Sequence, residues 1–191
     1  MSELEIVTKR LRLSPLLASD AQALFEYRSD PDVCRYQSFE PGSLEDARAF
    51  IGGLANETFG VPDSWFQFGI RPLESGLLVG DLGVHFLPDE PRQVEIGFTL
   101  AARHQGRGYA TEAVVAVLDH LFVARKMHRV FASVDPRNEA CLALLNRVGM
   151  RREAHFRQSL WFKGEWADDV VCGLLASEWR IRPVADAPRQ G

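Results

Sequence analysis

The spacing of hydrophobic positions changes along the chain between a period of two and a helical period. Leu11 and Leu13 alternate with arginines, which predicts a half-buried strand over 8–13. Three later runs also alternate, and turns rich in proline and glycine separate them, as is typical of an antiparallel meander. These three predicted strands cover residues 66–70, 77–86 and 94–100.

Four segments carry apolar residues at helical spacing, and they predict helices over 19–29, 43–54, 109–124 and 138–148. Ser19 and Gln22 have the spacing of a capping box at the start of the first helix, which should end before the Asp30-Pro31 pair. Asn138 is predicted as the N-cap of the fourth helix, and Gly149 as its stop.

The order of these elements predicts the fold class. A buried strand at 129–134 separates the last two helices, and two strands near 154–162 and 169–176 close the chain. A strand–helix–strand unit requires a parallel pair, so we predict a mixed α+β fold whose central sheet is mostly antiparallel and flanked by helices. Residues 1–181 are expected to form a single domain, and the proline-containing segment 182–191 a disordered tail.

Composition narrows the classes of function. The 191 residues are 46% hydrophobic and 25% charged, and no apolar run approaches the roughly 20 residues that span a bilayer. The first residues lack the basic and apolar regions of a secretory signal. A net charge of −4 gives no reason to expect nucleic acid or a membrane as partner. Cys34, Cys141 and Cys172 are not spaced for zinc or disulfides, so we expect a cytoplasmic protein without a metal ion.

The segment before the predicted helix at 109–124 has the composition of a phosphate-binding loop. Gly106 and Gly108 allow backbone N–H groups to approach a ligand closely. The helix N-terminus adds a positive dipole end, and Arg103 and Arg107 can fork onto phosphate oxygens. These features suit a pyrophosphate group. A plain glycine turn with two solvated arginines is the alternative interpretation.

A dinucleotide-binding oxidoreductase is the main rival for this loop. Gly106 and Gly108 open a helix, and Asp135 ends the next strand near the position of a ribose-binding acid. However, Thr111 occupies the third glycine position of that fingerprint, and residues 101–105 separate the strand from the first glycine. The nucleotide P-loop is excluded because the chain has no Gly-x-x-x-x-Gly-Lys sequence.

The loop sequence Arg103-His104-Gln105-Gly106-Arg107-Gly108 resembles the acetyl-coenzyme A (acetyl-CoA) motif of the GNAT superfamily of acetyltransferases, Gln/Arg-x-x-Gly-x-Gly/Ala. Other segments resemble, in order and spacing, the Rim-type branch of this superfamily, which contains ribosomal-protein N-terminal acetyltransferases. These segments are 8–13, 30–36, 94–98, 106–113, 134–138, 147–150 and 163–170. The resemblance covers almost the whole chain. It implies an acetyl-CoA-dependent N-acetyltransferase with a sheet splayed at the acetyl-CoA site.

The resemblance also implies which residues hold acetyl-CoA. Backbone groups of Phe98, Thr99 and Leu100 would contact the pantetheine arm and the thioester oxygen. Asn138 would contact the same arm, in addition to capping its helix. The pyrophosphate would lie against the loop formed by Arg103, His104, Gln105, Gly106, Arg107, Gly108, Tyr109 and Ala110.

The catalytic residues are a further implication of the resemblance. Some relatives use a carboxylate at the position of Glu95 as general base, and His85 on the neighbouring strand is an alternative. A strand glutamate that faces solvent is the non-catalytic interpretation. Many relatives have a tyrosine that acts as general acid where this chain has Leu145. The Rim branch often has a serine where this chain has Cys141. Cys141 is therefore the candidate acid, and the helix N-terminus is expected to lower its pKa.

The amine acceptor would enter between the loop after the first helix and the closing hairpin. Tyr36, Phe39, Trp161 and Trp166 fall in these segments, where they could cradle an acceptor or simply pack. The Rim-type resemblance favours a protein N-terminus, and relatives that acetylate antibiotics or metabolites keep a small-molecule amine open. Because the usual acids are missing, a non-catalytic acyl-CoA-binding protein is a further alternative. A homodimer is compatible with the resemblance, since dimers are common among relatives.

Overall fold

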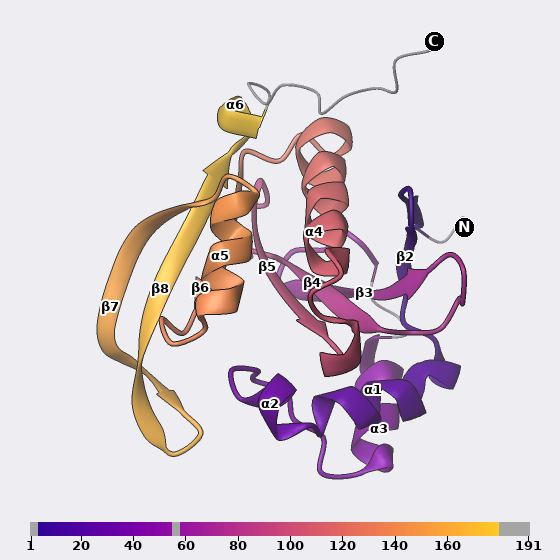
Figure 1. Ribbon diagram of the computed structural model, residues 1–191. Coiled ribbons are helices and arrows are strands. Elements are labelled where there is room, and N and C mark those ends of the chain that lie inside the picture. Colours follow the sequence, from indigo (N-terminus) through magenta and orange to yellow (C-terminus); the bar gives the residue numbers. More distant parts are fainter. Residues whose placement is uncertain (1–3, 55–57, 180–191) are drawn as a thin grey trace.

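The computed structural model describes residues 4–54 and 58–179, and its centre is one eight-stranded mixed sheet (Figure 1). The strands are β1 (Ile6–Val7), β2 (Leu11–Pro15), β3 (Ser64–Pro72), β4 (Gly80–Phe86), β5 (Gln93–Leu100), β6 (Arg129–Val134), β7 (Arg151–Phe162) and β8 (Glu165–Leu175). Their order in the sheet is β1-β2-β3-β4-β5-β6-β8-β7. Neighbouring strands are antiparallel except β5 and β6, which are parallel, so the predicted α+β class and the meander β3–β5 are confirmed.

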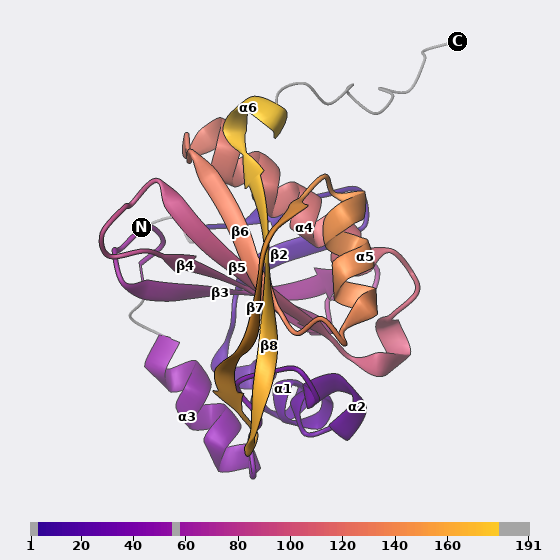
Figure 2. The same ribbon diagram turned by 90° about the vertical axis from the view of Figure 1, so that its left-hand side faces the viewer.

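The helices form two groups that pack against different parts of the sheet. They are η1 (Ala18–Asp20), α1 (Ala21–Arg28), α2 (Pro31–Cys34), α3 (Leu44–Leu54), η2 (Ala102–His104), α4 (Tyr109–Asp119), the π-helical turn η3 (His120–Ala124), α5 (Glu139–Arg147) and α6 (Ala176–Trp179). Figure 2 shows α4 and α5 beside each other, and α1 to α3 gathered at the lower end of the molecule.

Each helix group has its own buried apolar cluster. The larger cluster joins α4 and α5 to the sheet and includes the fully buried Leu118, Leu145 and Phe68. The smaller cluster joins α1 and α3 and includes Leu24 and Ala47. The end of β5 lies between the two clusters, because Leu100 belongs to the larger one and Ala101, just after the strand, to the smaller one.

The parallel pair β5–β6 opens into a gap. Its register covers Gln93 with Arg129, Val94 with Val130 and Glu95 with Phe131. β5 then continues beside β4 as far as Leu100, while β6 continues beside β8 as far as Val134. From residue 96 onward, the edge of β5 that faces β6 is therefore left without a strand partner. The backbone groups on that edge are available to a ligand.

Local capping differs from the sequence-based prediction. The capping box predicted at Ser19 and Gln22 is wrong: Asp20 instead accepts a hydrogen bond at 2.7 Å from the backbone N–H three residues before it and closes η1. Asp30 also does more than end α1. Its carboxylate accepts from the Asp32 N–H at 3.0 Å and caps α2, with Pro31 in the first helical turn. An aspartate followed by proline suits a helix start as well as a stop.

Other boundaries differ in smaller ways. The predicted helix 109–124 ends its α-helical part at Asp119 and finishes as a π-helical turn. The short elements β1 and α6 have too few residues to show a period, and the sequence did not predict them. The predicted tail 182–191 lies outside the described residues, as do residues 180–181 of the predicted domain. Within the described ranges, no helix is long and apolar enough to cross a membrane.

Candidate active site

A cavity of about 840 Å³ lies at the gap between β5 and β6. Its walls come from the end of β5, the loop before α4, the first turn of α4, the α2 segment and one side of α5. Many residues that the sequence singled out line it, namely Tyr36, Phe98, Thr99, Leu100, Gln105, Gly106, Gly108, Tyr109, Ala110, Asn138 and Cys141. The lining does not include Glu95, Arg103, His104, Arg107, Phe39 and Trp161.

The glycine loop has a backbone conformation that residues other than glycine rarely adopt. Gly106 has a φ of +73° and Gly108 a φ of +78°, in the left-handed region that favours glycine. A side chain at Gly106 would meet nothing within 4 Å, so the loop leaves open space there. Gly108 is the N-cap of α4, and no side chain caps this helix, which leaves the first N–H groups at the cavity wall for a ligand.

The cationic side chains of the loop lie at its outer side. Arg103 and Arg107 are exposed. The Nε2 atom of His104 accepts a hydrogen bond from Arg103 Nε at 3.2 Å. Burial, followed by the charges of Arg103 and Arg107, lowers the pKa of His104 below its usual value. His104 is therefore a neutral imidazole near physiological pH, and the charge of the loop comes from its two arginines.

The α5 side of the cavity begins with Asn138. Its side chain accepts a hydrogen bond from the Cys141 N–H at 3.1 Å, which confirms it as the N-cap. Its amide nitrogen remains able to donate a hydrogen bond into the cavity. Cys141 follows on the same helix face and also lines the cavity. The expected low pKa of this thiol is wrong, because burial, with a smaller effect from Cys172, raises it to about 12.

Glu95 lies on the other face of β5 from Phe98. Its side chain is 27% exposed, and its Oε2 lies 3.9 Å from His85 Nδ1. Burial raises the pKa of Glu95, His85 opposes this effect, and Asp169 adds to it. A carboxylate with a raised pKa is a better proton acceptor than an ordinary glutamate. Gly97 separates Glu95 from the cavity end of the strand, and it is exposed with nothing within 4 Å of an added side chain.

The four aromatic candidates for the acceptor site are dispersed. Tyr36 lines the cavity. Phe39 stacks on Phe50 at 4.2 Å between ring centroids and packs against the α1–α3 cluster. Trp161 and Trp166 meet edge to face at 5.3 Å on the closing hairpin, where they are 61% and 58% exposed.

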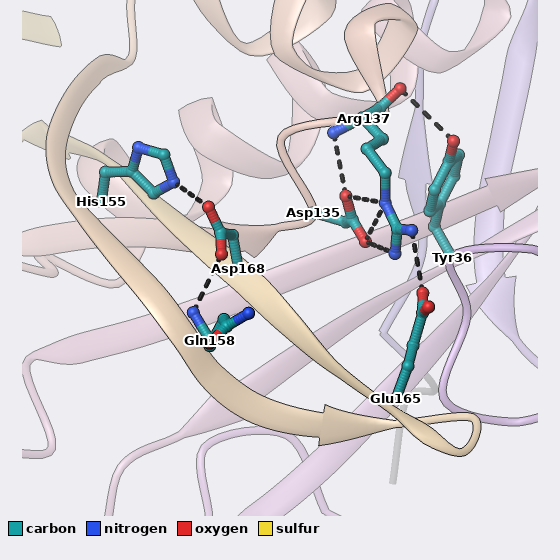
Figure 3. Close-up of polar contacts among 7 residues, drawn as sticks. All are labelled: Tyr36, Asp135, Arg137, His155, Gln158, Glu165 and Asp168. Carbon is teal, nitrogen blue, oxygen red and sulfur yellow. Dashed lines mark hydrogen bonds and ion pairs between the residues drawn. The ribbon is translucent and has the colours of Figure 1, made fainter.

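Polar contacts tie the closing hairpin to the cavity wall (Figure 3). Arg137 bonds Asp135 on one side at 2.7 Å and Glu165 of the hairpin on the other at 2.8 Å. Its backbone carbonyl accepts a hydrogen bond from the Tyr36 hydroxyl at 3.4 Å. Because Tyr36 and Arg137 both line the cavity, this contact joins two of its walls, the α2 segment and the segment that leads into α5.

Further contacts fix the shape of the hairpin and its tip. At an irregularity in the β7–β8 pairing, Asp168 binds His155 Nε2 at 2.7 Å and accepts from the Gln158 N–H at 2.9 Å (Figure 3). At the tip, Lys163 Nζ donates to the Cys34 carbonyl at 2.8 Å and to Glu40 at 2.5 Å. The sequence had assigned none of these residues a role in holding the hairpin.

Comparisons with known proteins agree with this geometry. A family model described as an acetyltransferase (GNAT) domain matches residues 10–151. The uncharacterized N-acetyltransferase YnaD of Bacillus subtilis is 31% identical over 92% of this chain and 99% of its own length. The [ribosomal protein uS5]-alanine N-acetyltransferase of Escherichia coli is 29% identical over 66% of each chain. A structure of Mycobacterium smegmatis RimJ in complex with CoA-disulfide has a TM-score of 0.76 and 26% identity, covering 88% of this chain and 83% of that one.

Proposed function

This chain belongs to the GNAT family of N-acetyltransferases, and on that premise we propose that it transfers an acetyl group from acetyl-CoA to the amino group of a protein N-terminus. The observation that supports acetyl-CoA as the cosubstrate is the open glycine loop at the start of α4. This loop lies beside a cavity at the gap in the sheet. The similarity to an enzyme named for the alanine of a ribosomal protein supports the acceptor.

The residues present fit acetyl-CoA along the length of the cavity. The loop from Gly106 to Ala110 offers backbone N–H groups and a helix N-terminus to the pyrophosphate. The free edge of β5 at Phe98 and Leu100 offers backbone groups to the amide-rich pantetheine arm, and Asn138 faces it from α5. Acetyl-CoA supplies the activated acetyl group and a thiolate leaving group.

The reaction requires the protein to handle two protons per turnover, one of which is released and one of which ends on the sulfur. The acceptor arrives as an ammonium ion and must lose a proton before its nitrogen can attack the thioester carbonyl. The C–N bond then forms, the C–S bond breaks, and a second proton from nitrogen reaches the sulfur. We assign the first step to Glu95, acting directly or through one water molecule. Its raised pKa and the open space at Gly97 beside it support this assignment.

We assign to Cys141 the role of assisting the departure of the coenzyme A thiolate. A thiol with a pKa of about 12 stays protonated at physiological pH, so it can donate a hydrogen bond but not act as a nucleophile. It lines the cavity one helical turn after Asn138. Because a thiolate is a stable leaving group, a weak S–H donor is enough to assist its departure.

The acceptor is proposed to approach the opposite side of β5, between the α2 segment and the closing hairpin. Tyr36 at the cavity mouth and Trp161 on the hairpin would flank it there. Phe39 would support this surface from beneath, since its ring stacks on Phe50. A small-molecule amine is the second candidate for the same place.

Isotope labelling tests the proposed reaction and the acceptor together. A bacterial lysate would be incubated with the protein and acetyl-CoA carrying a heavy acetyl group, and both peptides and metabolites would be analysed by mass spectrometry. We expect label on protein N-termini, and none with a Gly106→Val variant as control. Label only on metabolites would reject the protein acceptor. Coenzyme A binding without any labelled product would favour the non-catalytic alternative.

A further inference from the structure

The turn between β1 and β2 reaches the glycine loop through Arg10. The Nη1 atom of Arg10 donates to the carbonyl oxygen of Arg107 at 2.9 Å, and its Nε donates to Glu112 at 2.6 Å. The same guanidinium lies over the ring of Tyr109, 4.9 Å from the ring centroid. Arg10 thus contacts the loop between its two glycines and also the first turn of α4 behind it.

Glu112 is itself held by residues of the β1–β2 turn. Its Oε1 accepts hydrogen bonds from the Thr8 hydroxyl at 2.6 Å and from the Arg10 N–H at 2.9 Å. Burial acts to raise the pKa of Glu112, but the bonds from Thr8 and Arg10 outweigh it and bring the pKa below its usual value. The carboxylate is therefore charged near neutral pH, and it fixes the guanidinium in a single place.

Peptide geometry connects this contact to phosphate binding. In a trans peptide unit, the C=O and the N–H point in opposite directions. The Arg107 carbonyl that accepts from Arg10 belongs to the same unit as the Gly108 N–H. A carbonyl held on the Arg10 side therefore turns the Gly108 N–H toward the opposite side, and Gly108 lines the cavity.

The Arg107–Gly108 peptide needs such an external contact, because the hydrogen bonds that the loop makes by itself are at Gln105 and at the Gly108 carbonyl. Glycine leaves the left-handed region at little cost, and both Gly106 and Gly108 lie in that region. A rotated Arg107–Gly108 unit would present a carbonyl oxygen to the cavity, and its partial negative charge would repel a phosphate. The bond from Arg10 opposes that rotation.

We infer that Arg10 is a positioning residue for the pyrophosphate of coenzyme A, because it fixes the Arg107–Gly108 peptide with the Gly108 N–H facing the cavity. The inference rests on the proposed function, in which this loop binds the pyrophosphate. It gives Arg10, in the β1–β2 turn, a part in cosubstrate affinity, although this residue belongs neither to the glycine motif nor to the cavity lining.

Two ligands separate positioning from general stability. Coenzyme A contains the pyrophosphate, whereas pantetheine lacks it. For Arg10→Gln, calorimetry should show that coenzyme A binds roughly tenfold more weakly, which is about 1.4 kcal/mol. An NMR titration with pantetheine should give an unchanged affinity.

Arg12→Gln is the matched control, because Arg12 lies two residues further on, in β2, and is paired with Glu5 at 3.8 Å rather than with the loop. It should leave both affinities unchanged. Arg10→Lys keeps the charge but has a single donor nitrogen, whereas the guanidinium reaches Arg107 and Glu112 with two. It should therefore lose affinity for coenzyme A, but less than Arg10→Gln does. It also serves as the test if the glutamine variant does not fold.

Three outcomes would overturn the inference. Wild-type affinity of both Arg10 variants for coenzyme A would show that the contact has no effect on binding. An equal loss for coenzyme A and pantetheine would show a general structural effect. Absence of coenzyme A binding by the unaltered protein would instead reject the proposed function, and the inference with it.

Discussion

At the scale of single residues, two glycines mark where ligands can approach the backbone. Gly106 and Gly97 both have open space where a side chain would stand, one in the loop and one on β5. Gly106 also has a positive φ, whereas Gly97 lies in a regular strand. The conformation of the loop therefore favours glycine at position 106, whereas at Gly97 the structure shows only open space.

Gly106→Val tests the loop. A branched side chain would restrict the backbone and occupy the space assigned to the pyrophosphate, so coenzyme A should bind at least tenfold more weakly, roughly 1.4 kcal/mol. Gly76→Val is the matched control, because Gly76 also has a positive φ (+66°) and open space, but lies in the turn between β3 and β4. Calorimetry should show the loss only for Gly106→Val. Equal affinities in both variants would place the phosphate elsewhere.

Glu95→Gln tests the proposed base. It should lower kcat by about 10²-fold, within the usual range for loss of a general base, and leave the KM for acetyl-CoA unchanged. The base acts only when deprotonated, so the rate should fall as the pH drops through the raised pKa of Glu95. That acidic limb should disappear in the variant. A normal rate with an intact limb would move the role to His85.

Glu95→Gln should lower activity without lowering the stability of the fold. The pKa of Glu95 is higher in the folded state than in the unfolded state, so its contribution to stability is present at low pH and is lost as the pH rises through the folded pKa. At neutral pH, Glu95→Gln should therefore unfold at the same temperature as the wild type or at a higher one. A large fall in melting temperature would mean that the lost activity reflects unfolding.

Cys141 gives a third test at this scale. Serine is a stronger hydrogen-bond donor than a protonated thiol, so Cys141→Ser should keep or raise kcat. Cys141→Ala should cost less than about tenfold, because the thiolate departs with little help. Steady-state kinetics, normalised to folded protein, compares the two. A serine variant slower than the alanine variant would identify Cys141 as packing only.

At the scale of elements, the closing hairpin is a long projection held at its tip. β7 is largely exposed along its length, and the tip reaches the α2 segment through the contacts of Lys163 with Cys34 and Glu40. Exposed ion pairs contribute about 1 kcal/mol or less, so these contacts set the position of the hairpin more than the stability of the fold.

Lys163→Ala should release the tip of the hairpin. We expect faster backbone hydrogen exchange around residues 160–166, while coenzyme A affinity and melting temperature stay nearly unchanged. Arg48→Ala is the control, since Arg48 forms an exposed pair with Glu45 on α3. If the tip exchanges as slowly in Lys163→Ala as in the wild type, the hairpin is held by its own pairing with β8 rather than by α2.

At the scale of the whole molecule, a buried polar cluster joins α1 to the sheet. Asp81 of β4 is fully buried and binds Arg28 through two hydrogen bonds, at 2.5 and 3.0 Å. Tyr27 and Gln67 also donate to the same carboxylate. The charges of the pair are almost completely removed from water, so each requires the other.

Asp81→Ala should therefore be strongly destabilising. Removing one partner leaves the Arg28 charge buried without compensation, at a cost of about 3–5 kcal/mol in the free energy of unfolding. Urea denaturation measures this cost. Glu90→Ala, which breaks the exposed pair with Arg92, should leave the same quantity nearly unchanged. Similar values for the two variants would show that the cluster is hydrated in solution.

The sequence by itself determined the properties that depend on neighbouring residues. Alternation along β3 to β5 and helical spacing in α4 and α5 predicted those elements, because side-chain period follows directly from backbone geometry. Gly106 and Gly108 predicted a loop whose backbone can come close to a ligand, which is also a local property of glycine. The Asn138 cap also depends only on a residue three positions away.

The tertiary structure decided everything that depends on segments far apart in the chain. It placed Tyr36 in the cavity wall and Phe39 against a helix, although both come from one short segment. It raised the pKa of Cys141 to about 12, because burial outweighs the helix dipole that the sequence suggested. It also joined Arg10 to Glu112 and the glycine loop. Burial and long-range contacts arise only when strands and helices pack, and no local pattern of residues encodes them.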